Sequence, residues 1–289
     1  MTLPPITPDN PTPDALVTAA PQLPPVAQVL VRLQRLLANY DSSLDDVAKA
    51  IRLDAALTTR VIRVGNSVWF SRGGGCQTIE DAVNRMGFRE VFRLVAAAAA
   101  NAFVARPLVA YGRDAATAWH ESVSCACAAE LLAERVAEET GLSYTIGLLR
   151  GIGRTPIDRY AIVAKPGRIL ADAGFPIDYS ESELAMLGFN QATVARIMLT
   201  RWDFPETIVE PIAQQYDPLS APEPHDLQEA ILYGARLLHS AVATPDCEIG
   251  QLENENEILA CIRLTRDDVL ACREELATRL KRLSDVLRV

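Results

Sequence analysis

The sequence has no apolar run long enough to cross a membrane. Its longest candidate, residues 91–104, is interrupted by Arg93 and Asn101 and consists largely of alanine, whereas a membrane-spanning helix needs roughly 20 apolar residues. The first residues also lack the basic start and apolar core of a signal peptide. From these absences we expect a cytoplasmic protein that does not associate with a membrane.

Aromatic residues are scarce, at 6% of the chain, and no segment shows the sustained Val, Ile and Thr alternation of a strand. Ala and Leu are abundant instead, and they favour helices over sheets. Apolar residues recur at helical spacing along most of the chain. Two pairs resemble a capping box at a helix start, Thr78 with Asp81 and Thr265 with Asp268. The sequence therefore predicts an all-α protein.

Familiar catalytic and metal-binding motifs are missing. The six cysteines form no Cys-x-x-Cys pair, and we interpret them as small buried apolar residues. Gly73-Gly74-Gly75 follows no strand and precedes no Lys-Ser/Thr, so it is read as a turn and not as a phosphate loop. The only histidines are His120, His225 and His239, and no Ser or Cys nucleophile is paired locally with one of them. We expect neither a metal nor another cofactor.

Proline dominates the start of the chain, with eight prolines in the first 25 residues. The stretch up to Pro21 shows no periodic apolar face, and we predict a flexible tail over residues 1–20. Helical periodicity begins after Leu23-Pro24-Pro25 and continues to the C-terminus, where residues 266–287 carry a long apolar stripe. That stripe is more typical of packing within the chain than of a partner's helix.

The net charge of −9 argues against a general nucleic-acid binder. Residues 44–106 nevertheless carry nine basic and six acidic side chains, a local charge of +3. Residues 44–66 also loosely resemble a helix-turn-helix, but the second helix is apolar and short of side chains that could read base edges. Five arginines of the basic stretch recur at helical spacing: Arg60, Arg63, Arg85, Arg89 and Arg93. They form either a solvated face or a docking face for an acidic partner or a phosphate-bearing ligand.

Nine short segments, taken in order, resemble one family, the HD-related output domain (HDOD) family. Four lie in the first half of the chain: Leu23 to Pro25, Ile51 to Thr58, Gly65 to Ser67 and Ala82 to Gly87. Five lie in the second: Trp119 to Ser122, Gly147 to Arg154, Glu183 to Gln191, Thr200 to Pro205 and Ile208 to Pro218. Each segment is weakly diagnostic, but the complete ordered series is fairly specific. The resemblance covers about residues 21–218.

The resemblance implies a domain organisation. Residues 21–106 would form an N-terminal helical subdomain and residues 107–218 a degenerate HD-like subdomain. Residues 219–289 would add a C-terminal helical extension. The family is a non-catalytic relative of the HD-type metal phosphohydrolases and is associated with bacterial signal transduction.

HD-type hydrolases hold divalent metal through a first His, a His-Asp pair and a later Asp. The resemblance places His120 at the first position, but the pair reads Arg150-Gly151 and the later acid falls near Gly234, Ala235 or Arg236. A guanidinium is always cationic and cannot ligate metal, and glycine has no side chain. A three-histidine site would need His120, His225 and His239 to converge. The sequence therefore predicts a degenerate metal site.

Two interpretations of Arg150 remain open. It would form an internal ion pair with Glu121 or Glu183, because a buried unpaired cation is costly, or it would bind an anion. In either case the groove between the two halves, near His120, Arg150, Gly151, Glu183 and Arg236, is the default place for a protein partner or a small ligand.

Three hypotheses of function follow. The first is a non-enzymatic signalling module that binds a protein partner, or a small ligand, through its HDOD domain. The second is residual metal-dependent hydrolysis of a nucleotide, against which the missing ligands argue. The third is a transcription regulator that binds DNA, which is supported only by the local basic face.

Overall fold

The computed structural model describes residues 11–19, 25–37, 44–67, 70, 75–167, 169–170, 178–220, 226–245, 251 and 254–288. These residues form helices and connecting loops, and the only β-type pairing among them is a single bridge between Leu108 and Arg113. The all-α prediction is confirmed. None of the helices in this part of the chain is long and apolar enough to cross a membrane.

The chain divides into two compact units that do not follow the simple order of the sequence. One unit comprises Met1–Gln22 and Val104–Leu276, and the other comprises Leu23–Phe103 and Ala277–Val289. The predicted boundary at 106/107 therefore lies close to the observed one. The C-terminal extension, however, is divided between the two units: residues 219–276 belong with the HD-like segment, and residues 277–289 belong with the N-terminal segment.

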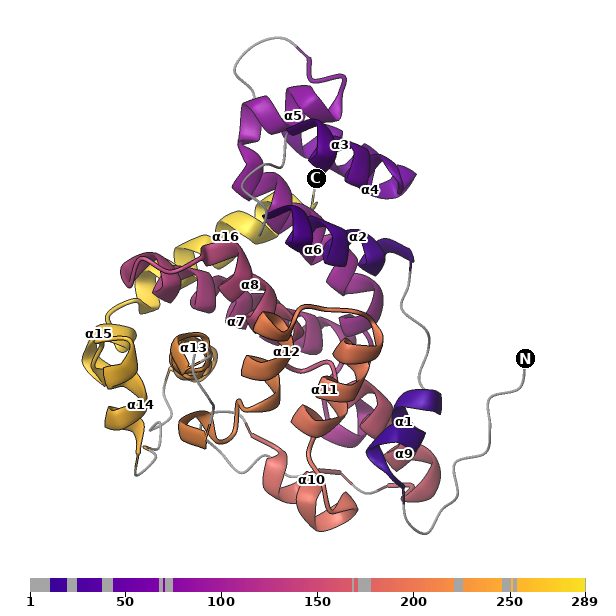
Figure 1. Cartoon of the computed structure of the whole chain (residues 1–289), viewed down its shortest axis with the longest axis vertical. Coiled ribbons are helices and arrows are strands. Elements are labelled where there is room, and N and C mark those ends of the chain that lie inside the picture. Colours follow the sequence, from indigo (N-terminus) through magenta and orange to yellow (C-terminus); the bar gives the residue numbers. More distant parts are fainter. Residues whose placement is uncertain are drawn as a thin grey trace. The chain divides into compact units, whose positions relative to one another are not determined.

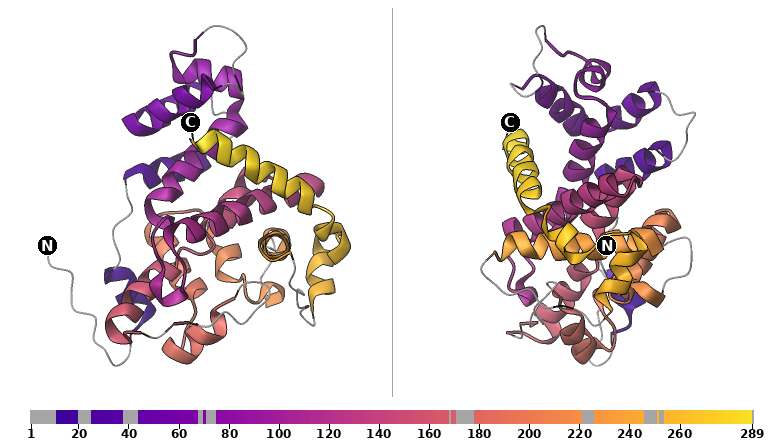
Figure 2. Two further views of the ribbon diagram at one scale, coloured as in Figure 1. Left: turned by 180° about the vertical axis from the view of Figure 1, so that it is seen from behind. Right: turned by 90° about the vertical axis from the view of Figure 1, so that its left-hand side faces the viewer.

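The larger unit is built around α7, α8 and α13, which pack against one another (Figure 1). Helices α14 and α15 pack on α13, and Figure 2 (left) looks along α13 with these two helices beside it. The larger unit contains α1 (Pro13–Ala19), η1 (Val109–Tyr111), α7 (Ala115–Arg135), α8 (Thr140–Leu149), α9 (Arg154–Ala164), α10 (Ser180–Leu187), α11 (Gln191–Arg201), α12 (Glu206–Ala213), η2 (Pro218–Ser220), α13 (Asp226–Ala243), α14 (Glu255–Cys261) and α15 (Arg266–Leu270). The start of α16 (Arg273–Arg288) also belongs to it.

The smaller unit packs α3 against α2, α4 and α5. Asp54 caps α4 by accepting hydrogen bonds from the backbone of Ala56 and Leu57, and Thr78 and Asp81 form the predicted capping box of α5. The second predicted box, Thr265 with Asp268, starts α15 in the larger unit. The smaller unit contains α2 (Pro25–Leu37), α3 (Leu44–Arg52), α4 (Ala55–Gly65), α5 (Ile79–Met86), most of α6 (Phe88–Val104) and the end of α16.

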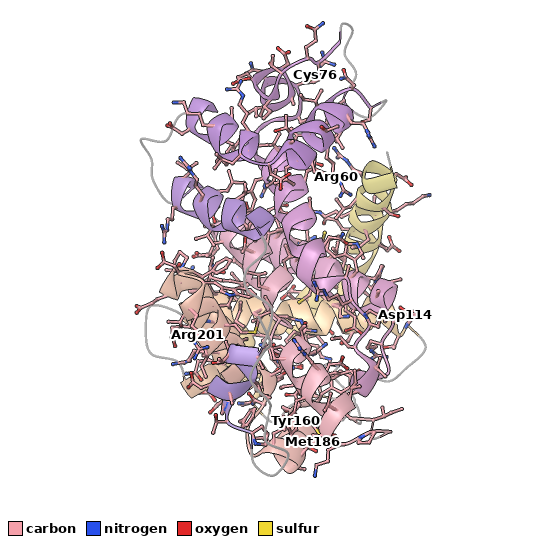
Figure 3. All side chains as sticks on the ribbon, turned by 90° about the vertical axis from the view of Figure 1, so that its right-hand side faces the viewer. Arg60, Cys76, Asp114, Tyr160, Met186 and Arg201 are labelled. Atoms are coloured by element: carbon pink, nitrogen blue, oxygen red, sulfur yellow. The ribbon has the colours of Figure 1, made fainter. Side chains whose placement is uncertain are left out.

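The expected N-terminal tail differs from the structure, because α1 occupies part of residues 1–20. Leu16 and Val17 are buried, and α1 packs on α9 and α11. Arg201 of α11 pairs with Asp14 and also donates a hydrogen bond to Thr18 Oγ1 (Figure 3). A helix of seven residues is too short to produce a recognisable apolar periodicity, and its stability comes from tertiary contacts.

Helix α7 ends at Arg135, because Ala137 adopts a left-handed backbone (φ 59°) and the Glu139 side chain caps the start of α8. The expectation that the cysteines are buried needs one correction. Of the six cysteines, Cys76, Cys125, Cys127 and Cys272 are buried as expected, but Cys261 is exposed. Cys247 lies outside the residues that the structure describes.

Candidate functional site

The predicted site residues come from four elements of the larger unit. His120 is on α7, Arg150 and Gly151 are in the turn between α8 and α9, Glu183 is on α10 and Arg236 is on α13. Arg150, Glu183 and Arg236 are buried, whereas His120 is exposed. All five predicted site residues belong to the larger unit. The fold of this unit alone positions them, without a groove between two halves of the chain.

Two glycines set the position of the turn that carries Arg150. A Cβ atom added to Gly147 would lie 2.6 Å from the carbonyl oxygen of Cys125, so glycine allows α8 to lie directly on α7. A Cβ atom at Gly153 would collide with the backbone of Gln191 on α11. Because neither backbone can yield cheaply, the sequence needs glycine at both ends of the turn.

Glu121 is paired with arginines other than Arg150. Its Oε2 atom lies 3.3 Å from Arg154 Nη1, and its Oε1 atom lies 2.8 Å from Arg113 Nε. The Arg154 side chain is only 4% exposed. The expected ion pair of Arg150 with Glu121 or Glu183 is therefore wrong, and Arg154, one helical turn further along the chain, pairs with Glu121 in its place.

Glu183 is held by hydrogen bonds on both of its oxygen atoms. Oε1 accepts from the Tyr111 hydroxyl at 2.8 Å, and Oε2 accepts from the Gln191 backbone N–H at 2.6 Å. Burial raises the pKa of Glu183, and this effect outweighs the hydrogen bonds and the charge of Arg154, which lower it. The Arg154 guanidinium also lies 5.0 Å from the centre of the Tyr179 ring, in cation–π range. Arg154 is thus enclosed by a carboxylate, Glu121, and an aromatic ring.

Arg236 is connected to the Arg150 backbone through Gln215. Arg236 Nη1 donates to the Gln215 carbonyl oxygen, and Gln215 Nε2 donates to the Arg150 carbonyl oxygen at 3.0 Å. Arg236 Nη2 lies 3.4 Å from Asp178, and its guanidinium lies 4.9 Å from the centre of the Tyr216 ring. Burial lowers the pKa of Arg236.

Arg150 differs from the other arginines of the cluster. Its side chain is buried, at 3% exposed, yet it forms no ion pair with any residue that the structure describes, and its Nη1 atom has no hydrogen-bond partner there. Its guanidinium lies beside the Cys125 thiol, whose pKa is raised by burial and partly lowered again by Arg150. A buried cation without a carboxylate partner is unusual in a protein interior.

His239 is a site residue that the sequence analysis did not place in the groove. It is 1% exposed, and its Nδ1 atom lies 2.9 Å from Ser124 Oγ of α7. Its Nε2 atom has no hydrogen-bond partner in the described part of the chain. The sequence spacing could have predicted this placement. His239 lies three residues after Arg236, so the two residues share a face of α13. His120 and His239 line the same pocket, whereas His225 lies outside the described residues.

The environment of His239 predicts acid destabilisation. Burial, followed by the positive charges of Arg150, His120, Arg154 and Arg113, lowers its pKa to about 3 from an ordinary value of 6.5. Below pH 6.5 His239 binds a proton in the unfolded chain but stays neutral in the folded protein. The free energy of unfolding therefore decreases as the pH falls below 6.5. We expect His239 to contribute a loss of about 2 kcal/mol between pH 7 and pH 5.

Urea denaturation at a series of pH values measures this loss. His239→Gln removes the titrating group, and the slope of unfolding free energy against pH should flatten by the same amount. An unchanged slope in this variant would show that His239 has the same pKa in the folded protein as in the unfolded chain.

Comparisons with known proteins agree with this architecture. The HDOD domain family model matches residues 23–218, which is more than half of the chain. The chain belongs to the HDOD family. A protein from Treponema pallidum with no described function is 26% identical over 207 residues, which are 70% of this chain but only 39% of that protein. The chain therefore matches about two fifths of the curated relative's length.

Solved structures share the HDOD fold at low sequence identity. A protein from Shewanella amazonensis SB2B, named for phosphohydrolase activity, is 24% identical with a TM-score of 0.64, and the match covers 94% of this chain and 95% of that one. A protein from Marinobacter aquaeolei VT8, named for signal transduction, is 22% identical with a TM-score of 0.69 over 96% of this chain and 61% of that one. An HDOD protein of unknown function from Geobacter sulfurreducens is 19% identical with a TM-score of 0.63 over 95% and 94%. At these identities the likeness establishes the fold.

The side chains of this HDOD protein do not fit the metal centre of HD-type hydrolases. Among the residues with described positions, no three His, Cys, Asp or Glu side chains are placed to hold an ion. The family resemblance assigns Arg150 and Gly151 to the positions of the metal-binding His-Asp pair, and these residues supply a buried guanidinium and no side chain. Guanidinium groups donate hydrogen bonds and carry positive charge, so they repel a divalent cation.

The five arginines of the predicted docking face all lie in the smaller unit. Arg85 Nη1 donates to the Gly65 carbonyl oxygen at 3.3 Å, and Arg93 pairs with Glu90 at 2.9 Å. Burial, followed by the charge of Arg63, lowers the pKa of Arg60. Arg63 and Arg89 are exposed. Part of this face therefore has a structural role, and Arg63 and Arg89 are its most accessible members.

The helix-turn-helix interpretation gains little from the structure. Helix α4 would be the recognition helix, but it buries Leu57, Val61 and Val64 against its own unit. Its exposed positions are Ala55, Ala56, Thr59 and Arg63, so only two of them carry a hydrogen-bonding side chain for base edges.

Proposed function

We propose that this HDOD protein is a non-enzymatic regulatory module that acts in signal transduction by binding a protein partner. One observation carries the proposal: Arg150, which the family resemblance assigns to the position of a metal-binding histidine, has a buried guanidinium that forms no ion pair with a described residue. The guanidinium of Arg150 would thus supply the positive charge that a metal ion supplies in a hydrolase. The scaffold keeps its positive centre but loses the means to activate water.

The surrounding contacts support this replacement. Glu121 and Asp178 form ion pairs with Arg154 and Arg236 at 3.3 and 3.4 Å. In a hydrolase such carboxylates would bind metal or water. In this protein they form ion pairs with arginines. The site is therefore organised as a rigid structural centre, and function is expected at the surface of the domain.

Arg63 and Arg89 of the smaller unit are the surface that we propose for docking an acidic partner. Reversing both charges, as Arg63→Glu with Arg89→Glu, should reduce capture of the partner from the native host by about tenfold or more, because complementary charge steers association and fixes register. Thermal unfolding should change little, because both side chains are exposed. Affinity capture with quantitative mass spectrometry measures the effect.

A matched control reverses two exposed arginines of the larger unit, Arg135→Glu with Arg263→Glu. The control should retain the proteins that the wild-type chain captures. Equal capture by wild type and by the Arg63/Arg89 variant would exclude this face as the docking surface.

A further inference from the structure

The larger unit contains an open pocket of about 450 Å³ beside the arginine cluster. It is lined by residues that precede or lie on the first half of α7 and by residues at the end of α13: Arg113, Ala116, Thr117, His120, Glu121, His239, Ala243 and Thr244. Six of these eight side chains are polar, and a volume of this size suits a small metabolite.

His239, which lines this pocket, has a buried nitrogen atom without a hydrogen bond to any described residue. Its Nδ1 contacts Ser124 Oγ, but Nε2 has no partner in the described part of the protein. A buried ring nitrogen without a hydrogen bond destabilises the folded protein, because it has lost its contact with water and gained no other. A polar group from outside the chain would remove this cost.

The charges around the pocket favour an anion. The largest electrostatic effects on His239 come from Arg150, His120, Arg154 and Arg113, and all four are cationic or can become so. Glu121 also lines the pocket, but its two oxygens are already paired with Arg113 and Arg154. Arg150 does not line the pocket, but it has no carboxylate partner among the described residues, so its positive charge acts on His239 without compensation by an ion pair.

We propose that this pocket binds the phosphate group of a small phosphate monoester. A tetrahedral phosphate accepts hydrogen bonds from several directions, which matches a wall that carries the N–H groups of one arginine and two histidines. The inference rests on the proposed non-catalytic function, because the ester is held and not hydrolysed. The ligand would couple the HDOD scaffold to a metabolite signal.

Isothermal titration of the full chain in excess chelator tests the inference. The probes are glycerol 3-phosphate, inorganic phosphate and, as the neutral match, glycerol. Saturable binding of both phosphates without binding of glycerol is expected. His120→Ala removes a donor from an exposed position of the pocket wall, and it should weaken binding by about tenfold or more.

The control is Thr59→Val. Thr59 is exposed, belongs to the smaller unit and is not one of the residues that line the pocket. The control should bind as wild type does. Absence of phosphate binding, or equal affinity in all three proteins, would overturn the inference without affecting the proposed function.

A separate arm adds manganese and measures phosphate release from glycerol 3-phosphate. Release that His120→Ala abolishes would confirm that the pocket holds a phosphate ester, and it would contradict the proposed non-catalytic function. The two proposals therefore fail by different results.

Discussion

Replacing Arg154 with methionine is expected to lower the free energy of unfolding by about 3 to 5 kcal/mol, because the change removes one of the two arginines that pair with the buried carboxylate of Glu121. Arg154 lies 3.3 Å from Glu121 and contacts the Tyr179 ring, and its side chain is 4% exposed. Methionine fills a similar volume but provides no charge. The midpoint and slope of urea denaturation at neutral pH measure the loss.

The matched control is Arg135→Met, which breaks the ion pair with Glu275 at 2.9 Å, where both side chains are more than 40% exposed. An exposed pair contributes about 0 to 1 kcal/mol, so this variant should remain close to wild type. If Arg154→Met cost no more than the control, the arginine cluster would not be the structural centre of the domain.

The second large effect is expected for Gly147→Ala. The added methyl group would lie 2.6 Å from the Cys125 carbonyl oxygen and 2.8 Å from the Ala126 Cα atom, both of which are backbone. Helix α8 must then move away from α7, and we expect a loss of about 3 kcal/mol, at the upper end of the usual cost of overpacking. Thermal and urea denaturation both report the change.

Gly75→Ala is the control for this substitution. A Cβ atom at Gly75 would meet no other atom within 4 Å, and the residue does not need a positive φ. Its stability should differ from wild type by less than about 0.5 kcal/mol. Similar stability of both variants would show that α7 and α8 tolerate a wider separation than the structure indicates.

The sequence was sufficient to predict the helical fold. Helical periodicity, capping pairs and the ordered HDOD segments are local signals, and they located His120, Arg150 and Arg236 on elements that the structure brings into one unit. The loss of metal ligands stays a prediction, because it depends on the positions that the resemblance assigns to these residues.

The sequence was not sufficient to predict which charges pair. Arg150 and Arg154 are one helical turn apart and chemically identical, so only tertiary packing decides that Arg154 contacts Glu121. Helix α1 was missed for a similar reason, since its contacts with α9 and α11 come from residues about 140 to 190 positions away. The division of the C-terminal helices between two units likewise has no local signal.

The central claim is that buried guanidinium groups have replaced the metal ion of the HD site. Equilibrium dialysis of the purified full chain against manganese, after removal of bound metal by a chelator, tests it most directly. The claim predicts no saturable site, and the same result for wild type and for His120→Ala. Binding of about one ion per chain that is lost in His120→Ala would contradict it, because a ligand set able to activate water would then exist.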